Sequence, residues 1–259
     1  MKLVSTLTAA AALALVAGAA NADIVAQWNF NGDSSATVPG GGSTPSTAVG
    51  TGSASLVGGP VGSFASGISN GGSTDPVTTS PANFGWGTTT YPAASANNET
   101  AGAQFLVSTV GFEDIVISWD QRHSNTSSRF WAFLYTTDGT SWNRLFLDNT
   151  NANPGTTAGA AFGANGTLSG PAGDTWFNNR SVNLSSLIAV DDNANFGFRI
   201  VSSFDSGTSY TASNGASSYA TTGTARFDMV TIRATAIPAP GSVALLSLGS
   251  LIAIRRKRV

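Results

Sequence analysis

The chain has 259 residues and a mass of 26.2 kDa, with 12 Lys and Arg against 14 Asp and Glu, one His and no Cys. The absence of cysteine excludes disulfide scaffolds, Cys-ligated zinc, iron–sulfur clusters and thiol nucleophiles, and one histidine argues against multi-histidine metal sites. The nearly balanced charge argues against nucleic acid as a partner, because nucleic-acid-binding proteins carry a clustered basic face.

The first 22 residues have the pattern of a secretory signal peptide. Lys2 supplies the positive charge at the start, and residues 3–17 form an apolar run. Ala20 and Ala22 then frame a small-x-small cleavage site. We therefore expect the secretion machinery to export the chain and residues 1–22 to be removed, which leaves Asp23 as the first residue of the mature protein.

Residues 23–236 form an acidic body without lysine. They contain seven basic residues, all Arg, and all 14 acidic residues, so their net charge is 7 − 14 = −7. An acidic surface disfavours anionic polymers and tolerates divalent cations. At this length the body fits one all-β domain.

Eight short segments of the body have the composition of β-strands, being rich in β-branched and aromatic residues and bounded by Gly, Asn, Asp or Ser: 24–30, 103–108, 115–120, 130–136, 142–147, 177–184, 196–204 and 225–233. Asp138-Gly139 predicts a hairpin with a type I′ turn, in which both central residues have positive φ. Residues 184–190 predict one helical turn. The Gly-, Ser- and Thr-rich stretches 31–52, 67–98 and 149–174 are predicted to be long loops of a single antiparallel β-sandwich.

A polar cluster at the end of the 115–120 strand is the first candidate site. It contains Trp119, Asp120, Arg122 and the only histidine, His123. As a ligand pocket it would bind glycan, with Asp120 and Arg122 hydrogen-bonding to sugar hydroxyls and Trp119 stacking on a sugar ring. The alternative is a structural ion pair of Asp120 with Arg122 or Arg129, beside a tryptophan of the core. Strand alternation places Trp119 on the opposite face from Asp120 and Arg122.

Calcium is the one inorganic cofactor that the sequence brings into question, and no organic cofactor is predicted. Calcium takes six to eight oxygen ligands, and Asn29, Asn31 and Asp33 supply oxygens at alternate positions. Asp228 shares the strand phase of the apolar residues that follow it, which predicts that it faces inward. If the first and last strands are neighbours, Asp228 joins the set. The alternative is a plain turn at 29–33 and an Asp228 that caps a turn or pairs with an arginine.

The sequence offers little for catalysis. Glycoside hydrolysis needs paired carboxylates, and Glu occurs only at Glu99 and Glu113 while Asp is scattered in turns. Residues 67–71 match the G-x-S-x-G pattern of esterases, but without the strand, helix and nearby histidine that the nucleophile elbow requires. We therefore expect no catalytic residues.

The last 23 residues, 237–259, differ from the body. A proline motif is followed by an apolar run at 243–254 and a basic cluster: Pro238, Ala239, Pro240, then Arg255, Arg256, Lys257 and Arg258. The 18 residues from 237 to 254 reach the lower limit for a membrane-spanning helix. A terminal basic cluster holds that end in the cytoplasm.

This end resembles the PEP-CTERM sorting signal of exported bacterial proteins, with Ala239 where that family usually has glutamate. The resemblance implies export and membrane anchoring through the tail. It further implies cleavage near the proline motif by an exosortase-like membrane protease and delivery to the cell surface or the extracellular space.

Residues 103–235 resemble the jelly-roll sandwiches of secreted bacterial proteins, through a Thr-Asp-Gly turn at 137–139, a Trp-bearing strand after it and the closing strand 226–232. That class contains carbohydrate-binding and purely structural members. We therefore expect a signal peptide (1–22), a jelly-roll-like β-sandwich (23–236) and a sorting segment (237–259). The expected role is a non-catalytic structural or glycan-binding component of the cell surface or extracellular matrix. The alternative is a secreted hydrolase acting on polysaccharide or ester.

Overall fold

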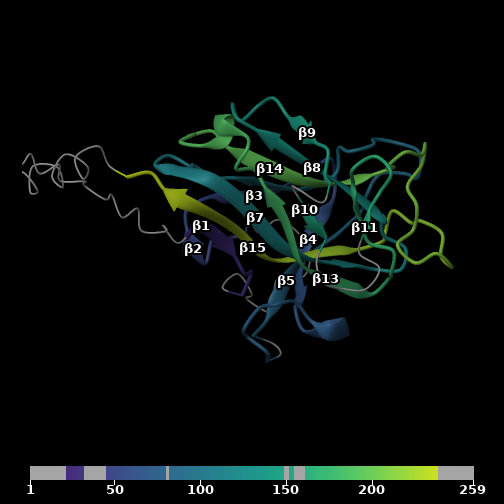
Figure 1. Cartoon of the computed structure of the whole chain (residues 1–259). Coiled ribbons are helices and arrows are strands. Elements are labelled where there is room, and N and C mark those ends of the chain that lie inside the picture. Colours follow the sequence, from purple (N-terminus) through teal and green to yellow (C-terminus); the bar gives the residue numbers. More distant parts are fainter. Residues whose placement is uncertain (1–21, 32–44, 80–81, 149–151, 155–160, 239–259) are drawn as a thin grey trace, which may run out of the picture.

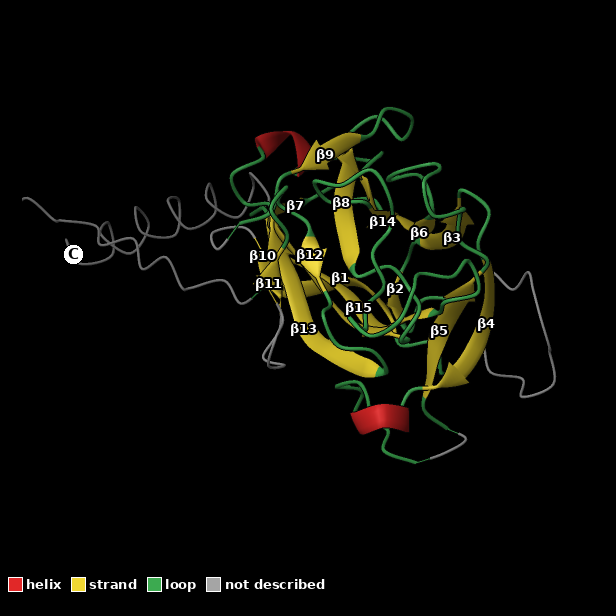
Figure 2. Cartoon of the chain, turned by 90° about the vertical axis from the view of Figure 1, so that its right-hand side faces the viewer, coloured by secondary structure: helices red, strands yellow, loops and turns green. Residues whose placement is uncertain are grey.

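The computed structural model of the chain describes residues 22–31, 45–79, 82–148, 152–154 and 161–238. These residues form two antiparallel β-sheets packed face to face (Figures 1 and 2), which confirms the predicted all-β sandwich. The expected membrane span at 243–254 and residues 1–21 of the expected signal peptide lie outside this part of the chain. Neither of the described helices is long and apolar enough to cross a membrane.

Among the described residues the first sheet has eight strands and the second has seven. In hydrogen-bonded order the first contains β10 (Ala152–Pro154), β13 (Thr175–Asn183), β7 (Phe112–His123), β15 (Ala225–Ala236), β1 (Asp23–Trp28) and β2 (Val49–Gly50), with β5 (Phe84–Thr89) beside β15 and β4 (Val61–Ser66) beside β5. The second contains β11 (Ala161–Phe162), β12 (Leu168–Ser169), β8 (Phe130–Thr136), β14 (Gly197–Ser203), β6 (Gly102–Leu106) and β3 (Ser53–Val57), with β9 (Asn143–Leu145) beside β8. Two short 3-10 helices are η1 (Ser69–Gly71) and η2 (Ile188–Val190).

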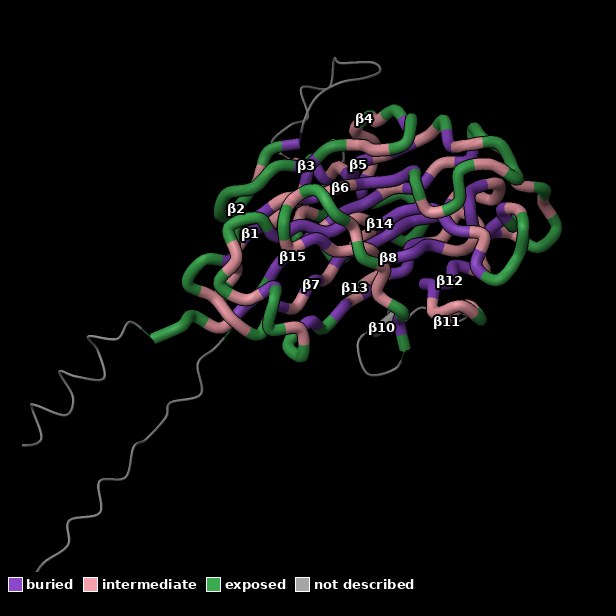
Figure 3. Tube along the Cα trace, turned by 90° about the horizontal axis from the view of Figure 1, so that it is seen from above, coloured by how far each residue is buried: buried purple, intermediate pink, exposed green. Residues whose placement is uncertain are grey.

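Aromatic side chains between the two sheets form the core, and buried residues follow the central strands (Figure 3). The rings of Phe105 and Phe198 stack at 5.0 Å, and those of Phe133 and Phe198 at 5.6 Å. Trp119 of the first sheet stacks on Phe133 of the second at 6.1 Å. Because alternate residues of each strand point inward, these rings interdigitate and join the two sheets.

All eight predicted strand segments contain a strand, and η2 lies within the predicted helical turn. The sequence did not predict β2, β3, β4, β5, β10, β11 or β12. All three predicted loops are corrected: 31–52 contains β2, 67–98 contains β5, and 149–174 contains β10, β11 and β12. In β4 and β5, neighbouring side chains occupy the space beside two of the glycines. A Cβ on Gly62 would stand 2.6 Å from Trp86 Nε1, and one on Gly85 would stand 2.9 Å from Arg226 Cγ.

The predicted hairpin joins β8 to β9, but its turn is not of type I′. Gly139 has a φ of 77°, but Asp138 does not have a positive φ, and a type I′ turn requires it at both central residues. The Asp138 carboxylate instead accepts hydrogen bonds from the Thr140 and Ser141 N–H groups at 2.8 and 2.6 Å. A side chain that binds its own turn replaces the second left-handed residue.

Strand β15 determines where the candidate site lies. Along one edge it pairs with β7, and along the other it pairs first with β5 and then with β1, so the predicted neighbourhood of first and last strands is confirmed. Between these two partners the register with β7 shifts at a bulge, where Met229 has a φ of 48°. The extra residue reverses the alternation, so Phe227 and Val230 both face the core while Asp228 faces the other way. The inward orientation predicted for Asp228 is therefore wrong.

The core predicts a clear difference between two truncations. We expect Phe198→Ala to lower the free energy of unfolding by about 3–5 kcal/mol, because it removes a ring stacked on both Phe105 and Phe133. Ile188→Ala, at a residue that is 82% exposed, should change it by less than about 0.5 kcal/mol. Denaturant unfolding of both variants measures the difference, and equal losses would contradict this description of the core.

Candidate functional site

Residues 67–79, called the crossing loop below, lie on the outer face of the first sheet, the face turned away from the second sheet. Side chains or backbone of the loop contact three strands. The Thr74 N–H and hydroxyl donate to Asp120 Oδ2 of β7 at 2.5 and 2.7 Å, and the Ser73 hydroxyl donates to Asp228 Oδ2 of β15 at 2.6 Å. From β13, Asn178 Nδ2 donates to the Gly72 carbonyl at 3.0 Å. The loop is thereby fixed across β13, β7 and β15.

The four residues predicted as a ligand pocket lie on two faces of β7. Trp119 (1% exposed) and His123 (0%) point into the core, whereas Asp120 and Arg122 point to the outer face under the crossing loop. The strand alternation noted in the sequence is confirmed, and the four side chains do not form one pocket. Trp119 is covered by Phe133 and is not available for stacking on a ligand.

Asp120 and Asp228 lie opposite each other on β7 and β15, so two carboxylates are close neighbours on the outer face. The pKa of Asp228 is raised to about 8, chiefly by burial; hydrogen bonds from Ser73 and Met229 oppose the rise, and the charges of Asp75 and Asp120 add to it. Burial also raises the pKa of Asp120, while hydrogen bonds from Thr74 and Asn179 oppose this shift. Neither carboxylate takes part in the two ion pairs among the described residues, Arg122–Asp174 and Arg144–Glu99.

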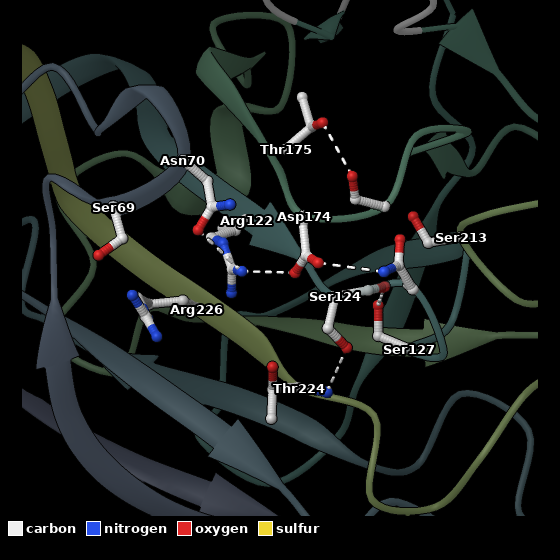
Figure 4. Close-up of polar contacts among 12 residues, drawn as sticks. Ser69, Asn70, Arg122, Ser124, Ser127, Asp174, Thr175, Ser213, Thr224 and Arg226 are labelled. Atoms are coloured by element: carbon white, nitrogen blue, oxygen red, sulfur yellow. Dashed lines mark hydrogen bonds and ion pairs between the residues drawn. The ribbon is translucent and has the colours of Figure 1, made fainter.

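Arg122 and Arg226 form the next cross-strand pair on the same face (Figure 4). Arg122 Nη2 donates to Asp174 Oδ1 at 2.5 Å and to Asn70 Oδ1 at 3.1 Å, and Asn125 also donates to Asp174. Arg226 donates to the Ser66 carbonyl, and burial together with the charge of Arg122 lowers its pKa to about 10. The ion pair predicted for Asp120 is therefore not formed: Arg122 pairs with Asp174 instead, and Arg129 is in neither of the two ion pairs among the described residues.

The structure brings together only part of the predicted calcium set. Asn29 Oδ1 accepts a hydrogen bond from the Asn31 N–H at 3.3 Å, as in a plain turn, and Asp33 lies outside the described residues. Asn31 Nδ2 donates to Asp75 Oδ2 at 2.7 Å, and Asp75 belongs to the loop that also holds Asp228 through Ser73. Asn31 and Asp228 therefore reach one acidic cluster, made of Asp75, Asp120 and Asp228. The sequence singled out Asp120 for a different site and did not single out Asp75.

A polar cleft of about 220 Å³ lies beside this cluster on the outer face. It is lined from four strands and the crossing loop, by Gln27, Thr74, Ser118, Trp119, Asp120, Asn179, Met229, Thr231 and Arg233. Arg233, Asn179 and Thr74 are exposed at its rim, and Asp120 is buried at its floor. Asp120 is the only predicted site residue with a polar side chain at this cleft. Strand phase alone, applied to Ser118 and Asp120, is the signal in the sequence that points to this face.

A second polar group lies inside the sandwich. Arg180 is fully buried, donates to the Ser169 carbonyl at 2.9 Å and lies over the Phe177 ring at 4.8 Å. Burial lowers the pKa of Arg180 to about 9. Burial and the charge of Arg180 hold the pKa of His123 well below its ordinary value, so the imidazole is neutral. Its Nδ1 lies 3.1 Å from the Ser128 carbonyl, and this histidine is part of the core.

Most predicted targeting residues lie beyond the described part of the chain. Outside it are Ala20, Ala239, Pro240, Arg255, Arg256, Lys257 and Arg258. Ala22 and Pro238 are the first and last residues that the structure describes. Strand β1 begins at Asp23, the residue after the expected cleavage site, and β15 ends at Ala236, just before the proline motif. Asp23 pairs with Ala234, so the two ends of the body lie side by side.

No protein-family model matches the chain, and no curated protein is significantly similar to it. The geometry of the outer face is therefore what points to a function.

The single histidine allows a direct test of the interior. We expect the His123 imidazole signal in NMR spectra to stay constant from pH 8 down to pH 5, because burial and Arg180 keep the ring neutral. Since the folded-state pKa lies below the unfolded value of about 6.5, the contribution of His123 to stability is present above that pH and is lost as the pH falls toward the folded pKa.

The matched variant is Arg180→Met, which removes the neighbouring charge and keeps the apolar stem. We expect the pKa of His123 to be higher in this variant than in the unsubstituted protein. An unsubstituted protein whose imidazole titrates near pH 6.5 would contradict the burial described for His123.

Proposed function

We propose that this protein is exported and presented at the cell surface or in the extracellular matrix, where it acts as a non-catalytic, jelly-roll-like module that binds glycan. The observation that carries this proposal is the polar cleft on the outer face. Its rim offers an amide, a hydroxyl and a guanidinium, which are groups that hydrogen-bond to sugar hydroxyls. If no glycan binds, we propose a purely structural role at the same location.

The size of the cleft supports recognition of one unit of a polymer. At about 220 Å³ it is smaller than the roughly 300–1,000 Å³ of pockets that enclose small molecules. A shallow site on an exposed sheet face leaves the rest of a long chain outside. The acidic body, with a net charge of −7 over residues 23–236, favours neutral over anionic glycans.

The hydrolase alternative has weaker support. Two carboxylates of a glycosidase must both reach the substrate. Asp120 lines the cleft, but Asp228 is 0% exposed beneath the crossing loop. Ser69 of the G-x-S-x-G pattern lies in η1, and the only histidine is buried in the core. Neither arrangement gives a nucleophile with an accessible base.

The positions of the chain ends support the export part of the proposal. Removal of residues 1–22 and of the tail after Pro238 leaves every described strand complete. Because Asp23 and Ala234 are paired, both targeting segments attach at the same end of the sandwich. An anchor at that end leaves the sheet faces accessible to a partner. The proposed partners are thus the secretion machinery, an exosortase-like protease, the membrane through the tail, and glycan.

Glycan binding is tested on an array with two arginine variants. We expect the unsubstituted protein to bind a subset of neutral glycans and Arg233→Ala to weaken binding by about tenfold or more, since it removes a charged hydrogen-bond donor from the rim. Arg129→Ala, outside the cleft, is the matched control and should bind like the unsubstituted protein. If the protein binds no glycan on the array, glycan binding is contradicted and the structural role is favoured.

Export is tested by intact-mass analysis of the protein recovered from fractions of its native cells. We expect chains that begin at Asp23 and end near the proline motif at 238–240, found in the surface or extracellular fraction. A full-length chain recovered from the cytoplasm would contradict the export proposal.

A further inference from the structure

Four separate segments meet where β15 exchanges β5 for β1. Asn31 follows β1, Ser73 and Asp75 come from the crossing loop, Asn83 directly precedes β5, and Asp228 lies in the bulge of β15. All five residues have side-chain oxygens, and they come from four different segments of the chain. The fold therefore gathers oxygen atoms at a junction between strands.

Asn83 is the observation that separates this junction from a simple group of acids. Its side chain is 2% exposed, and its Nδ2 donates to the Val77 carbonyl at 2.6 Å, but its Oδ1 has no hydrogen-bond partner. Asn83 Oδ1 and Asp228 Oδ2 border the same space, because a Cβ on Gly67 would lie 3.0 Å from Asp228 Oδ2 and closer still to Asn83 Oδ1. Glycine at position 67 lets the two acceptor oxygens come together beside its Cα. Of the two, only Asp228 Oδ2 receives a hydrogen bond, from the Ser73 hydroxyl, while Asn83 Oδ1 receives none.

The carboxylates around this space form no ion pair among the described residues. Asp75, Asp120 and Asp228 are all buried. Arg226 is the nearby cation that interacts electrostatically with Asp228, but its guanidinium donates to the Ser66 carbonyl. Buried carboxylates side by side are costly unless a cation or a proton compensates them.

We infer that this junction binds a calcium ion through the carboxylates of Asp228 and Asp75, Asn83 Oδ1 and the Ser73 hydroxyl oxygen. Hard oxygen ligands of mixed charge, completed by water, are what calcium takes, whereas zinc takes nitrogen and sulfur. Among the described residues no three His, Cys, Asp or Glu side chains converge as metal ligands, so the inferred site relies on two carboxylates, with Asn83 and Ser73 supplying neutral oxygens. Asn31 positions Asp75 by donating to it, and Asn29 takes no part.

The inference is tested by calorimetric titration of chelator-treated full-length protein with calcium chloride, together with thermal unfolding in calcium, magnesium or EGTA. We expect one calcium per chain, with a dissociation constant of about 10⁻⁴–10⁻³ M or tighter, as in extracellular modules. We also expect a melting temperature that is higher in calcium than in EGTA, because a ligand of the folded state stabilises it. Magnesium should raise it less.

Asp228→Asn is the informative variant, because it keeps the shape of the side chain and removes a buried charge. It should fold, and it should bind calcium at least about tenfold more weakly, in line with the loss of a group at a metal site. Asp174→Asn, whose carboxylate pairs with Arg122 away from the junction, is the matched control and should keep the full calcium response. Equal melting temperatures in calcium and EGTA, no heat of binding, or an unchanged response in Asp228→Asn would each overturn the inference. Equal responses to calcium and magnesium would overturn the choice of calcium.

Discussion

Strand β15 is hydrogen-bonded to β7 along one edge, while along its other edge two strands share it in succession. The bulge at Met229, where the register with β7 shifts, lies at the point along the strand where β5 ends and β1 begins. The bulge keeps Phe227 and Val230 in the core and turns Asp228 outward. The crossing loop, the acidic cluster and the floor of the cleft are all arranged around this one change of phase.

Burial of Asp228 has a structural consequence for the crossing loop. A loop of Gly, Ser and Thr has few apolar side chains with which to pack, so its position depends on polar contacts. Thr74 and Ser73 supply them by donating to Asp120 and Asp228. In return the loop covers two carboxylates that would otherwise face solvent. Loop and acids therefore stabilise one another, and a change to either alters both.

Much of the sandwich is predictable from sequence because its strands follow simple local rules. Strand 112–123 shows period-2 alternation of large apolar residues, and a period of two specifies which side chains share a face. Trp119 is thus correctly separated from Asp120. Strand 130–136 is recognisable because it is apolar and aromatic almost throughout. Strands β4 and β5 were not predicted, because glycine is uncommon within strands. Their glycines lie against Trp86 and Arg226, and only the folded chain brings these side chains close.

The candidate site was only partly predictable, for a related reason. Asp120 and Asp228 stand out in the sequence, but their pairing depends on the register between β7 and β15, and the orientation of Asp228 depends on a bulge. Asp75 and Asn83 lie in stretches without any periodicity, so nothing local distinguishes them from other loop residues. Arg233 and Asn179 likewise reach the cleft only through strand order.

The proposed glycan cleft and the proposed calcium ion share the crossing loop, and this gives the two proposals a physical connection. Thr74 forms part of the cleft and donates to Asp120, while the residues on either side of it, Ser73 and Asp75, belong to the calcium set. An ion bound by Ser73 and Asp75 would restrict the backbone of Thr74 between them. A rigid rim loses less conformational entropy when a ligand binds, so calcium would favour glycan binding without touching the sugar.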